Sequence, residues 1–441
     1  MLINREFLPN IANINKRNSS KDAPLHVACS KGQFKVVEYL VNGNAKVNIK
    51  GHKDYTPLHV AVSKGHTSIV KLLIARGSNV NQSAKDHWKP IHIAATLDLE
   101  AIVEILISSG AGINTKKNSP LHVAISNNAL KAALAFIRHG SNIDGEDHRD
   151  QTPLEVAIEK NHFDAVQFLI SNGANLNHED IKGQRPLHFC AYHDKPIIAQ
   201  LLIDKGAEVD ARDKHERTPL LVAVKHHSIA MTKLLLENRA HADAKGCDDR
   251  TPIYHSIRKG FHEFTKVLLD HGAEVDARYD QNHTLLHRAV SRGKIECVRV
   301  LLEYGASVNA IDNSTRTALY HAITSEDRNK DIVKILIDYG GNVHYRSNNG
   351  KTLLHFATVH GGNLDIANLL ISAGTDINAQ EIQGHTALQF AIRQNNVPLV
   401  KLLSDQGSLL TIKNIDDNNV IEYAFQWKVM DSLKTILINQ H

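Results

Sequence analysis

The chain has 441 residues, of which 42% are hydrophobic, 22% charged and 5% aromatic, and its formal net charge is +4. These are ordinary values for a globular protein, and so mild a positive charge does not by itself indicate nucleic-acid binding. No apolar run approaches the ~20 residues that a membrane-spanning helix needs, four cysteines make no disulfide framework, and the first residues lack the pattern of a secretory signal.

A six-residue motif recurs along the chain. Residues 56–61 read Thr-Pro-Leu-His-Val-Ala, and residues 23–28 and 89–94 are close copies. The slot of the proline falls at positions 24, 57, 90, 120, 153, 186, 219, 252, 285, 318, 353, 387 and, in a degenerate copy, 420. Nine of the twelve intervals are 33 residues, and the others are 30, 35 and 34. A fixed period of this length indicates stacked supersecondary units.

The chain begins with what reads as the end of such a unit. Residues 12–15 (Ala-Asn-Ile-Asn) match residues 78–81 (Ser-Asn-Val-Asn), which close the unit around the motif at 56–61. We therefore expect residues 1–19 to form an N-terminal capping part-unit with a truncated apolar helix. The alternative, that the chain is a segment cut from a longer protein, stays open.

The unit around residues 56–61 shows the plan that the others repeat. Thr56 offers a hydroxyl at the N-cap of a first helix, and Pro57 follows where its missing N–H costs nothing. The apolar residues of 69–74 predict a second helix, and Gly77 ends it in the left-handed conformation. Residues 82–89 then form an extended finger. Because two helices and a finger cannot bury their own apolar faces, the units must stack.

The motif Thr-Pro-Leu-His-x-Ala at a period of 33 resembles that of ankyrin-repeat proteins over essentially the whole chain. The resemblance implies an all-α, curved solenoid of about thirteen helix–turn–helix units with projecting β-hairpin or loop fingers. We expect one array over residues 1–441, with about twelve repeats in 20–414 and a degenerate C-terminal capping repeat in 415–441.

A few positions depart from the pattern. The finger around residues 115–118 is three residues short, the turn near 325–329 carries two extra residues, and one more lies around 361–362. Arg239 occupies a slot that holds glycine in most other units, and Asn44 fills the same slot in the first unit. A left-handed backbone there would strain a residue that carries a Cβ, so we expect Arg239 to be strained and Asn44 less so.

The histidines are the main candidates for chemistry, and 28 of them occur. The resemblance implies that those in the fourth slot of the motif tie neighbouring turns together by hydrogen bonds. One unit places Tyr254 in that slot and carries His255 beside it. Neither His255 nor His321 nor the pair His226-His227 has a carboxylate or cysteine at ligand spacing, so we expect no metal site. The fourth-slot histidines are His26, His59, His92, His122, His188, His287 and His355.

No signature of catalysis is present in the sequence. It contains no phosphate-binding G-x-x-x-x-G-K-[ST] loop, no H-E-x-x-H helix and no G-x-S-x-G turn. The acidic residues are scattered as surface charge, and no spacing predicts a pair across a cleft. The sequence therefore predicts neither an enzyme nor a bound cofactor.

Partner binding is the function that the resemblance implies, through finger tips and the exposed side of the first helices, which line a concave surface. Those slots are basic in the middle of the array. The charges are either a solvated face or a positive trough for an acidic peptide or phosphate-bearing partner. The candidate residues of this middle region are Tyr192, His193, Lys214, Arg217, Lys225, His226, Arg250, Arg258, Lys259 and Arg292.

Two aromatic residues form a second candidate set. Tyr55 and Trp88 occupy the same slot in successive fingers, just before the motif. Large aromatic side chains at exposed tips are common interface anchors. The alternative is that they pack against the neighbouring finger.

These features together predict a monomeric, cytoplasmic, non-catalytic scaffold that binds another protein or a peptide, with no nucleic acid and no membrane insertion. Two alternatives stay open. One is the recognition arm of a larger toxin, pathogen effector or ubiquitin-ligase adaptor, in which case the compartment is the host cytoplasm. The other is a structural tether without a single partner. The sequence does not name the partner.

Overall fold

The structure, a computed structural model, describes residues 14–115, 119–429, 431–432 and 434. Its contacts divide the chain into two compact units: unit 1 runs to Asn238 and unit 2 begins at Arg239. The expected N-terminal capping helix lies outside the described residues, as does most of the short finger at 115–118. That the whole chain is one array stays a prediction.

The first helix of each repeat begins at the motif, as the sequence predicts. In α3, the backbone N–H of His59 donates to Oγ1 of Thr56, the N-cap residue, and Pro57 occupies the first helical position. The same cap recurs at Thr218 and Thr251. The first helices of unit 1 are α1 (Pro24–Ser30), α3 (Pro57–Ser63), α5 (Pro90–Thr96), α7 (Pro120–Ser126), α9 (Pro153–Lys160), α11 (Pro186–Tyr192) and α13 (Pro219–Lys225). Those of unit 2 are α15 (Pro252–Lys259), α17 (Leu285–Ser291), α19 (Ala318–Thr324), α21 (Leu353–Val359), α23 (Ala387–Arg393) and α25 (Val420–Gln426).

The second helices present one apolar face to the first helices. In α4, for example, Ile69, Val70 and Leu73 are buried. The second helices of unit 1 are α2 (Phe34–Asn42), α4 (Thr67–Ala75), α6 (Glu100–Ser108), α8 (Leu130–Arg138), α10 (Phe163–Ser171), α12 (Pro196–Asp204) and α14 (Ile229–Glu237). Those of unit 2 are α16 (His262–Asp270), α18 (Ile295–Glu303), α20 (Lys330–Asp338), α22 (Leu364–Ser372) and α24 (Val397–Asp405).

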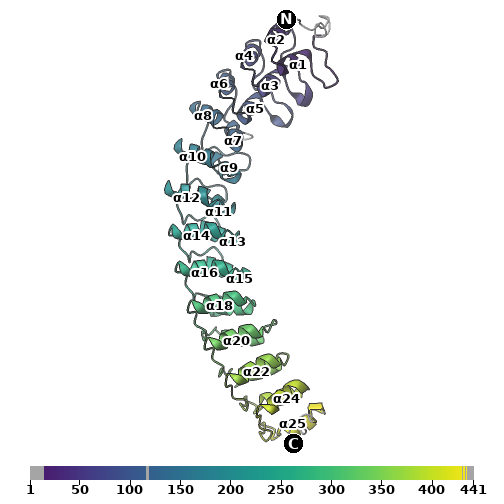
Figure 1. Cartoon of the computed structure of the whole chain (residues 1–441), viewed down its shortest axis with the longest axis vertical. Helices are drawn as coiled ribbons and strands as arrows, with labels where there is room; N and C mark the ends of the chain where they lie inside the picture. The colour runs from purple at the N-terminus through teal and green to yellow at the C-terminus, as the bar shows by residue number, and fades with distance from the viewer. Residues whose placement is uncertain (1–13, 116–118, 430, 433, 435–441) are drawn as a thin grey trace. The chain divides into compact units, whose positions relative to one another are not determined.

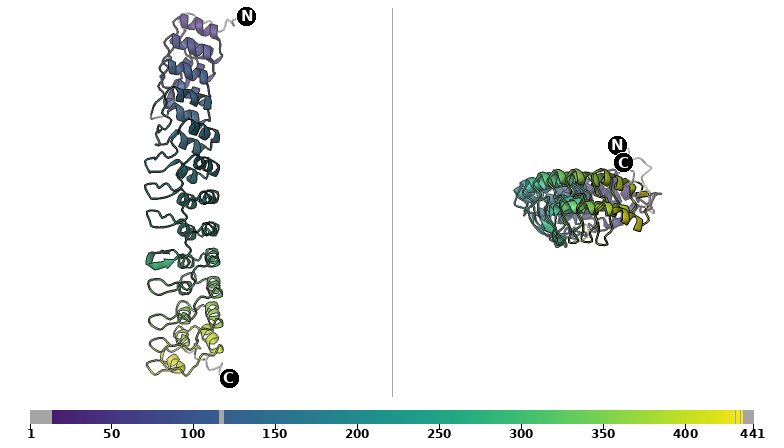
Figure 2. Two further views of the ribbon diagram at one scale, coloured as in Figure 1. Left: turned by 90° about the vertical axis from the view of Figure 1, so that its left-hand side faces the viewer. Right: turned by 90° about the horizontal axis from the view of Figure 1, so that it is seen from below.

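Stacking builds two helical layers within each unit (Figures 1 and 2). In unit 1, α1 packs on α3 and α3 on α5, while α2 packs on α4 and α4 on α6. In unit 2, α15 packs on α17 and α16 on α18 in the same way. Leu58, Ala61 and Leu73 are fully buried between the layers, and the small Ala61 side chain permits the close approach of neighbouring helices. The expected all-α architecture is confirmed.

The fingers are mostly loops held by local hydrogen bonds. Only one pair of strands is assigned among the described residues: β1 (Arg278–Tyr279) pairs antiparallel with β2 (His283–Thr284), across the short 3-10 helix η5 (Asp280–Asn282). Two fingers of unit 1 contain the short 3-10 helices η3 (His52–Asp54) and η4 (Lys85–His87).

The insertions that the sequence predicts lengthen the turns between helices. Three residues separate α3 from α4, whereas five separate α19 (which ends at Thr324) from α20 (which begins at Lys330), and four separate α21 from α22. Both insertions are therefore confirmed, and neither disturbs the helices on either side.

The fourth-slot histidines tie each repeat to the next. In His59, Nδ1 accepts from the backbone N–H of Thr56 at 3.1 Å, and Nε2 donates to the carbonyl oxygen of Trp88 in the next finger at 3.3 Å. Because the ring is buried, its pKa falls to about 4, so it is neutral. The implied role is confirmed by the same Nε2 contact, to a carbonyl 29 or 30 residues further on, at His26, His59, His122, His188, His287 and His355.

Arg239 does adopt the strained backbone that its slot predicts. Its φ is 66°, and that of Asn44 is 61°, beside 85° for Gly77. A Cβ built on Gly77 would meet nothing within 4 Å, so the strain in this slot comes from the backbone alone. We expect Arg239→Gly to raise the free energy of unfolding by about 1 kcal/mol, since relief of the left-handed strain exceeds the added freedom of the unfolded chain.

Thermal melts of Arg239→Gly and Asn44→Gly measure this effect. The midpoint should rise for Arg239→Gly and rise less for Asn44→Gly, because asparagine tolerates the left-handed region better. A lower midpoint for Arg239→Gly would show that the arginine side chain makes compensating contacts.

Candidate partner-binding surface

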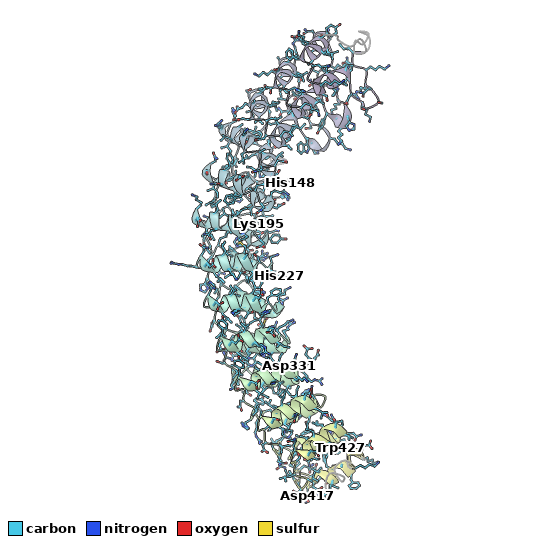
Figure 3. All side chains as sticks on the ribbon, viewed as in Figure 1. His148, Lys195, His227, Asp331, Asp417 and Trp427 are labelled. Atoms are coloured by element: carbon cyan, nitrogen blue, oxygen red, sulfur yellow. The ribbon has the colours of Figure 1, made fainter. Side chains whose placement is uncertain are left out.

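Unit 2 carries a cluster of arginines on its first helices and fingers, which we call the arginine cluster: Arg250, Arg258, Arg288 and Arg292. Arg250 precedes α15 in the finger, Arg258 lies in its last turn, Arg288 lies in α17, and Arg292 is the C-cap of α17. Since α15 and α17 pack on each other, residues of successive repeats come together. Figure 3 shows the side chains of the described residues.

Arg288 shows that these charges act on one another. Its pKa lies below the usual arginine value, first because burial removes the guanidinium from water and then because Arg292, Arg250 and Arg258 are positive neighbours. Its Nε is buried and has no hydrogen-bond partner among the described residues. Arg288 therefore carries a half-buried, incompletely compensated charge, which is costly unless a further group pairs with it.

A tyrosine explains why two of these arginines lie where they do. Tyr254 fills the slot that histidine holds in most units, and its ring is almost fully buried. The guanidinium of Arg250 lies over this ring at 4.2 Å from its centroid, and that of Arg288 lies at 5.2 Å. Both distances are in the range of cation–π attraction. Attraction to the ring thus offsets part of the repulsion between the two guanidiniums.

The cations of this region differ in whether a carboxylate pairs with them. Arg250 forms an ion pair, with Nη2 donating to Oδ2 of Asp280 at 2.7 Å. Arg258, Lys259 and Arg292 are exposed and form no salt bridge within the described residues. Three of the four predicted site residues in unit 2 are therefore available to an external anion, and Arg288, which the sequence analysis missed, joins them.

In unit 1, the predicted residues of the middle region include a cluster of aromatic and histidine rings and two cations that bond to their own or a neighbouring finger. The ring of Tyr192, which is 53% exposed, lies 4.9 Å from the ring of His193 and 4.5 Å from that of His226. The pKa of His226 is lowered by burial and by the charges of Arg217 and its neighbours. Lys225 precedes His226 at the end of α13 and is half-buried. This part of unit 1 offers an aromatic, weakly basic patch.

Lys214 and Arg217 take part in the structure of their own finger. Arg217 donates from Nε to Oδ2 of buried Asp213 at 2.7 Å and forms a salt bridge with it through Nη2 at 2.6 Å. The Nζ of Lys214 donates to the carbonyl oxygen of Ile181 in the preceding finger at 2.7 Å. Both charges are therefore partly compensated, which reduces their contribution to the field that an external partner would meet.

Tyr55 and Trp88 lie half-buried against the histidines of their own motifs. The ring of Tyr55 stacks on that of His59 at 5.2 Å, and the ring of Trp88 lies edge-on to that of His92 at 6.0 Å. Their backbone carbonyls also accept the repeat-to-repeat hydrogen bonds from His26 and His59. Their role as partner anchors stays a prediction.

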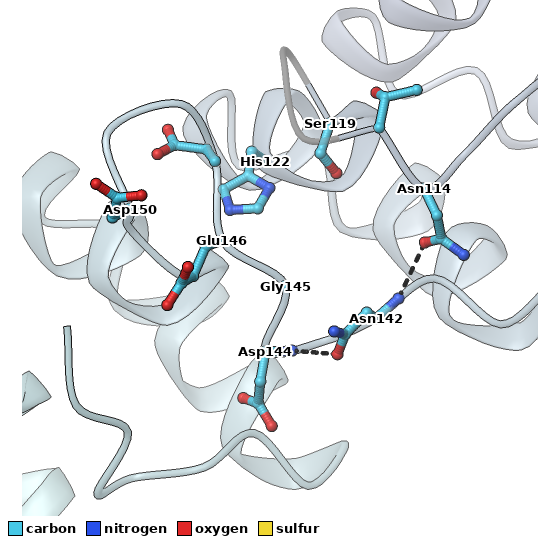
Figure 4. A pocket seen from close by; sticks show the side chains of 10 residues that line it. Asn114, Ser119, His122, Asn142, Asp144, Gly145, Glu146 and Asp150 are labelled. Carbon is cyan, nitrogen blue, oxygen red and sulfur yellow. Dashed lines mark hydrogen bonds between the residues drawn. The ribbon is translucent and has the colours of Figure 1, made fainter. Parts of the chain in front are cut away.

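A polar pocket of about 350 Å³ opens between two fingers of unit 1 (Figure 4). Its lining includes Asp144, whose Oδ1 accepts from the backbone N–H of Asn175 at 2.9 Å. It also includes Asp147, whose Oδ1 accepts from the backbone N–H groups of Arg149 and Gln151. These carboxylates hold the fingers in shape. His122 also lines the pocket; its Nε2 donates to the carbonyl oxygen of Gln151 at 2.9 Å, and its Nδ1 has no hydrogen-bond partner among the described residues.

One expectation about histidine chemistry is wrong. The sequence predicts no carboxylate at ligand spacing from His255 or His321, but Nε2 of His255 lies 3.7 Å from Oδ2 of Asp248. Nε2 of His321 lies 3.0 Å from Oδ2 of Asp312, and Nε2 of His283 lies 3.3 Å from the same oxygen. The finger folds back on its own first helix, so residues nine apart in sequence meet. Local spacing rules, which describe neighbours on one helix or loop, do not detect such a pair.

Known proteins share this repeat arrangement. A family model described as ankyrin repeats (3 copies) matches residues 2–86, 48–117, 91–180, 154–246, 238–312 and 309–381. No curated protein is matched. Among solved structures, the chain is similar to the ankyrin repeat domain of Bcl-3, a member of the IkappaB protein family, with 29% identity, a TM-score of 0.46, and coverage of 50% of this chain and 98% of that one. It is also similar to the human ASB11 ankyrin repeat domain, with 28% identity, a TM-score of 0.42, and coverage of 51% and 98%.

Ankyrin repeats generally mediate protein–protein interactions and are generally non-catalytic. None of the helices in the described residues combines the length and the apolar character that crossing a membrane requires. The family matches run without a gap from residue 2 to residue 381, and the described repeats continue the same architecture to α25. The chain belongs to the ankyrin-repeat family.

Proposed function

We propose that unit 2 binds an acidic segment of a partner protein through Arg258, Lys259, Arg288 and Arg292. The observation that carries this proposal is the state of Arg288, which is half-buried among three other arginines and has an unpartnered Nε. Clustered positive charge of this kind costs stability. A carboxylate or phosphate supplied from outside would offset that cost.

The chemistry of the cluster favours a planar or tetrahedral anion. Guanidinium groups donate in pairs to carboxylates and phosphates, a geometry that a lysine does not offer. Neighbouring helices pack at about 8–10 Å, close to the Debye length of about 8 Å at physiological salt, so the potentials of successive repeats add. An acidic segment running along the first helices of unit 2 would meet these charges in succession.

We propose that the aromatic patch of unit 1 is a second contact surface, for the same partner or for another one. Tyr192 and His226 present ring faces, and tyrosine is enriched where partners bury surface. Lys225 adds one charge beside them. That the protein is cytoplasmic remains a prediction from the sequence.

Charge reversal tests the proposal for unit 2. Arg258→Glu, Lys259→Glu and Arg292→Glu are combined in one variant, which leaves Arg250 and Arg288 on the Tyr254 ring. We expect this variant to bind a fluorescent glutamate-rich peptide about 10- to 100-fold more weakly than the wild type at low salt, at roughly 0.5–1 kcal/mol per exposed charge. Fluorescence anisotropy at several salt concentrations measures it, and the wild-type affinity should fall as salt rises.

The matched control reverses three exposed lysines on the second helices of unit 2: Lys266, Lys334 and Lys401. It carries the same change in net charge, so it separates a local site from a general field. Equal weakening in the two variants, with their helical content unchanged by circular dichroism, would remove the binding site from the first helices and contradict the proposal.

A further inference from the structure

Three metal-ligating side chains converge in unit 2, outside the arginine cluster. His283 comes from β2, Asp312 from the next finger, and His321 from α19. Their ligand atoms all lie within 4.8 Å of one another. They therefore join two successive fingers and a first helix at one point.

The separations suit a tetrahedral ion. Zinc binds nitrogen and oxygen ligands at about 2.0–2.2 Å, which places two ligands of a tetrahedron about 3.3 Å apart. The distances to Oδ2 of Asp312 are 3.3 Å from Nε2 of His283 and 3.0 Å from Nε2 of His321. The third edge, between the ligand atoms of the two rings, lies within 4.8 Å and would have to shorten toward about 3.3 Å if it is longer than that.

The carboxylate is already fixed and aimed. Oδ1 of Asp312 accepts from the backbone N–H groups of Ser314 at 2.7 Å and Arg316 at 2.9 Å, which leaves Oδ2 for the histidines. The Asp312 side chain is 4% exposed, while those of His283 and His321 are 30% and 19% exposed. Outer hydrogen bonds that orient a ligand are typical of metal sites. The partial exposure of the rings gives an ion a route from solvent.

We propose that His283, Asp312 and His321 bind one zinc ion, with water completing the tetrahedron. Without the ion, each Nε2 carries its proton and donates to Oδ2 of Asp312. With it, each ring moves that proton to Nδ1 and presents the Nε2 lone pair, so the net charge of the ligands does not change. The ion would then link neighbouring fingers and stabilise their stacking.

Another repeat of the chain has the same local fold with different side chains at the three ligand positions. Three repeats on, His385, Asn414 and Tyr423 occupy the corresponding slots, and Nδ2 of Asn414 lies 3.2 Å from Nε2 of His385. That set keeps one histidine but has an amide and a phenol in place of the other two ligands. It has the same local fold without the donor set for zinc, so variants based on it should fold.

Isothermal titration calorimetry of the full chain with zinc chloride tests the proposal. The variants are Asp312→Asn, after Asn414, and His321→Phe, after Phe356 in the equivalent slot, and the control is His385→Ala. We expect one tight zinc per wild-type chain and for the control, and at least about 100-fold weaker binding for both variants, since even second-shell changes cost 10- to 100-fold. The backbone contacts of Asp312 are available to asparagine, and melting curves without metal check the folding.

A second measurement does not depend on any variant. Cobalt replaces zinc in such sites, and the wild type should show the intense visible absorption of four- or five-coordinate cobalt, lost on addition of one equivalent of zinc. Weak absorption typical of the hydrated ion, or zinc affinity equal in the wild type, Asp312→Asn and His321→Phe, would overturn the proposal.

Discussion

Acidification from pH 7 to pH 4.5 is expected to unfold the repeats. The cause is the fourth-slot histidine, which is neutral and buried where it joins one repeat to the next. Burial lowers the pKa of His59, His287 and His355 to about 4 in the folded chain, against 6.5 for the ordinary value. Between pH 6.5 and pH 4, the unfolded chain therefore binds more protons than the folded chain does. The free energy of unfolding falls as the pH falls through this range.

The size of this effect is comparable to the stability of a domain. At pH 4.5, each of these three histidines lowers the free energy of unfolding of its own unit by about 2.5 kcal/mol, so His287 and His355 together lower that of unit 2 by about 5 kcal/mol. Single domains are usually stable by only about 5–15 kcal/mol. Loss should begin below pH 6.5 and level off below pH 4, where the folded rings are protonated as well.

Urea titrations followed by circular dichroism across this pH range measure the loss. The chain supplies a control, because Gln389 fills the same slot: its Oε1 accepts from the N–H of Thr386 at 2.9 Å, and its Nε2 donates to the carbonyl of Asn418 at 3.3 Å. A variant with His287→Gln and His355→Gln keeps both contacts and takes up no proton. It should recover about 5 kcal/mol at pH 4.5. An acid profile identical to that of the wild type would show that these rings are not the cause.

Glu155→Gln is expected to stabilise unit 1 at pH 8 by about 3 kcal/mol, and to have little effect at pH 4.5. Glu155 stands in the fourth slot and is fully buried. Its Oε2 accepts from the N–H of Thr152 at 2.7 Å, whereas Oε1 has no hydrogen-bond partner among the described residues and lies 3.7 Å from Nδ1 of His178. Burial, above all, raises the pKa of this carboxyl to about 7.

The sign is opposite to that of the histidines. The folded pKa of Glu155 lies above the unfolded value of 4.5, so its protonated form stabilises below pH 4.5 and the stabilisation is lost as pH rises through 7. Glutamine removes this dependence and supplies an N–H donor for the carbonyl of Gln184, the position equivalent to Asn418.

Chemical denaturation at pH 4.5 and pH 8 tests this expectation, with the reverse exchange Gln389→Glu as the matched variant. Gln389→Glu should destabilise unit 2 by a similar amount at pH 8. Equal stability of wild type and Glu155→Gln at both pH values would show that the carboxylate is solvated in the folded chain.

Much of this fold is readable from the sequence because each unit repeats the same local physics. Thr56 and Pro57 define a helix start by their own chemistry, and the left-handed slot of Arg239 follows from glycine in its neighbours. Glu155 stands in the fourth slot of its motif, so its replacement of histidine can also be read by aligning the repeats, although it is not among the residues singled out from the sequence. Such features depend on residues adjacent in the chain or one period apart.

The site features that escaped prediction depend on contacts between slots. Arg288 joins the candidate partner-binding residues because its guanidinium lies over the ring of Tyr254, a residue 34 positions earlier in the chain. The approach of His321 to Asp312 depends on how far a finger folds back over its own helix. Arg217 is a candidate partner-binding cation in the sequence, and in the structure buried Asp213 binds it. Sequence spacing does not show which of several basic residues will pair with a nearby carboxylate.

Photo-crosslinking tests the central claim, partner binding by the first helices of unit 2, most directly. A photoreactive amino acid replaces Arg292 in one chain and Lys334, on the second helix α20, in another. Each is irradiated in a lysate of the source cells, and crosslinked peptides are sequenced by mass spectrometry. We predict that position 292 captures one partner protein through a segment rich in Asp, Glu or phosphorylated residues, and that position 334 does not. Capture of that partner at position 334 instead of 292, or through a basic or apolar segment, would contradict it.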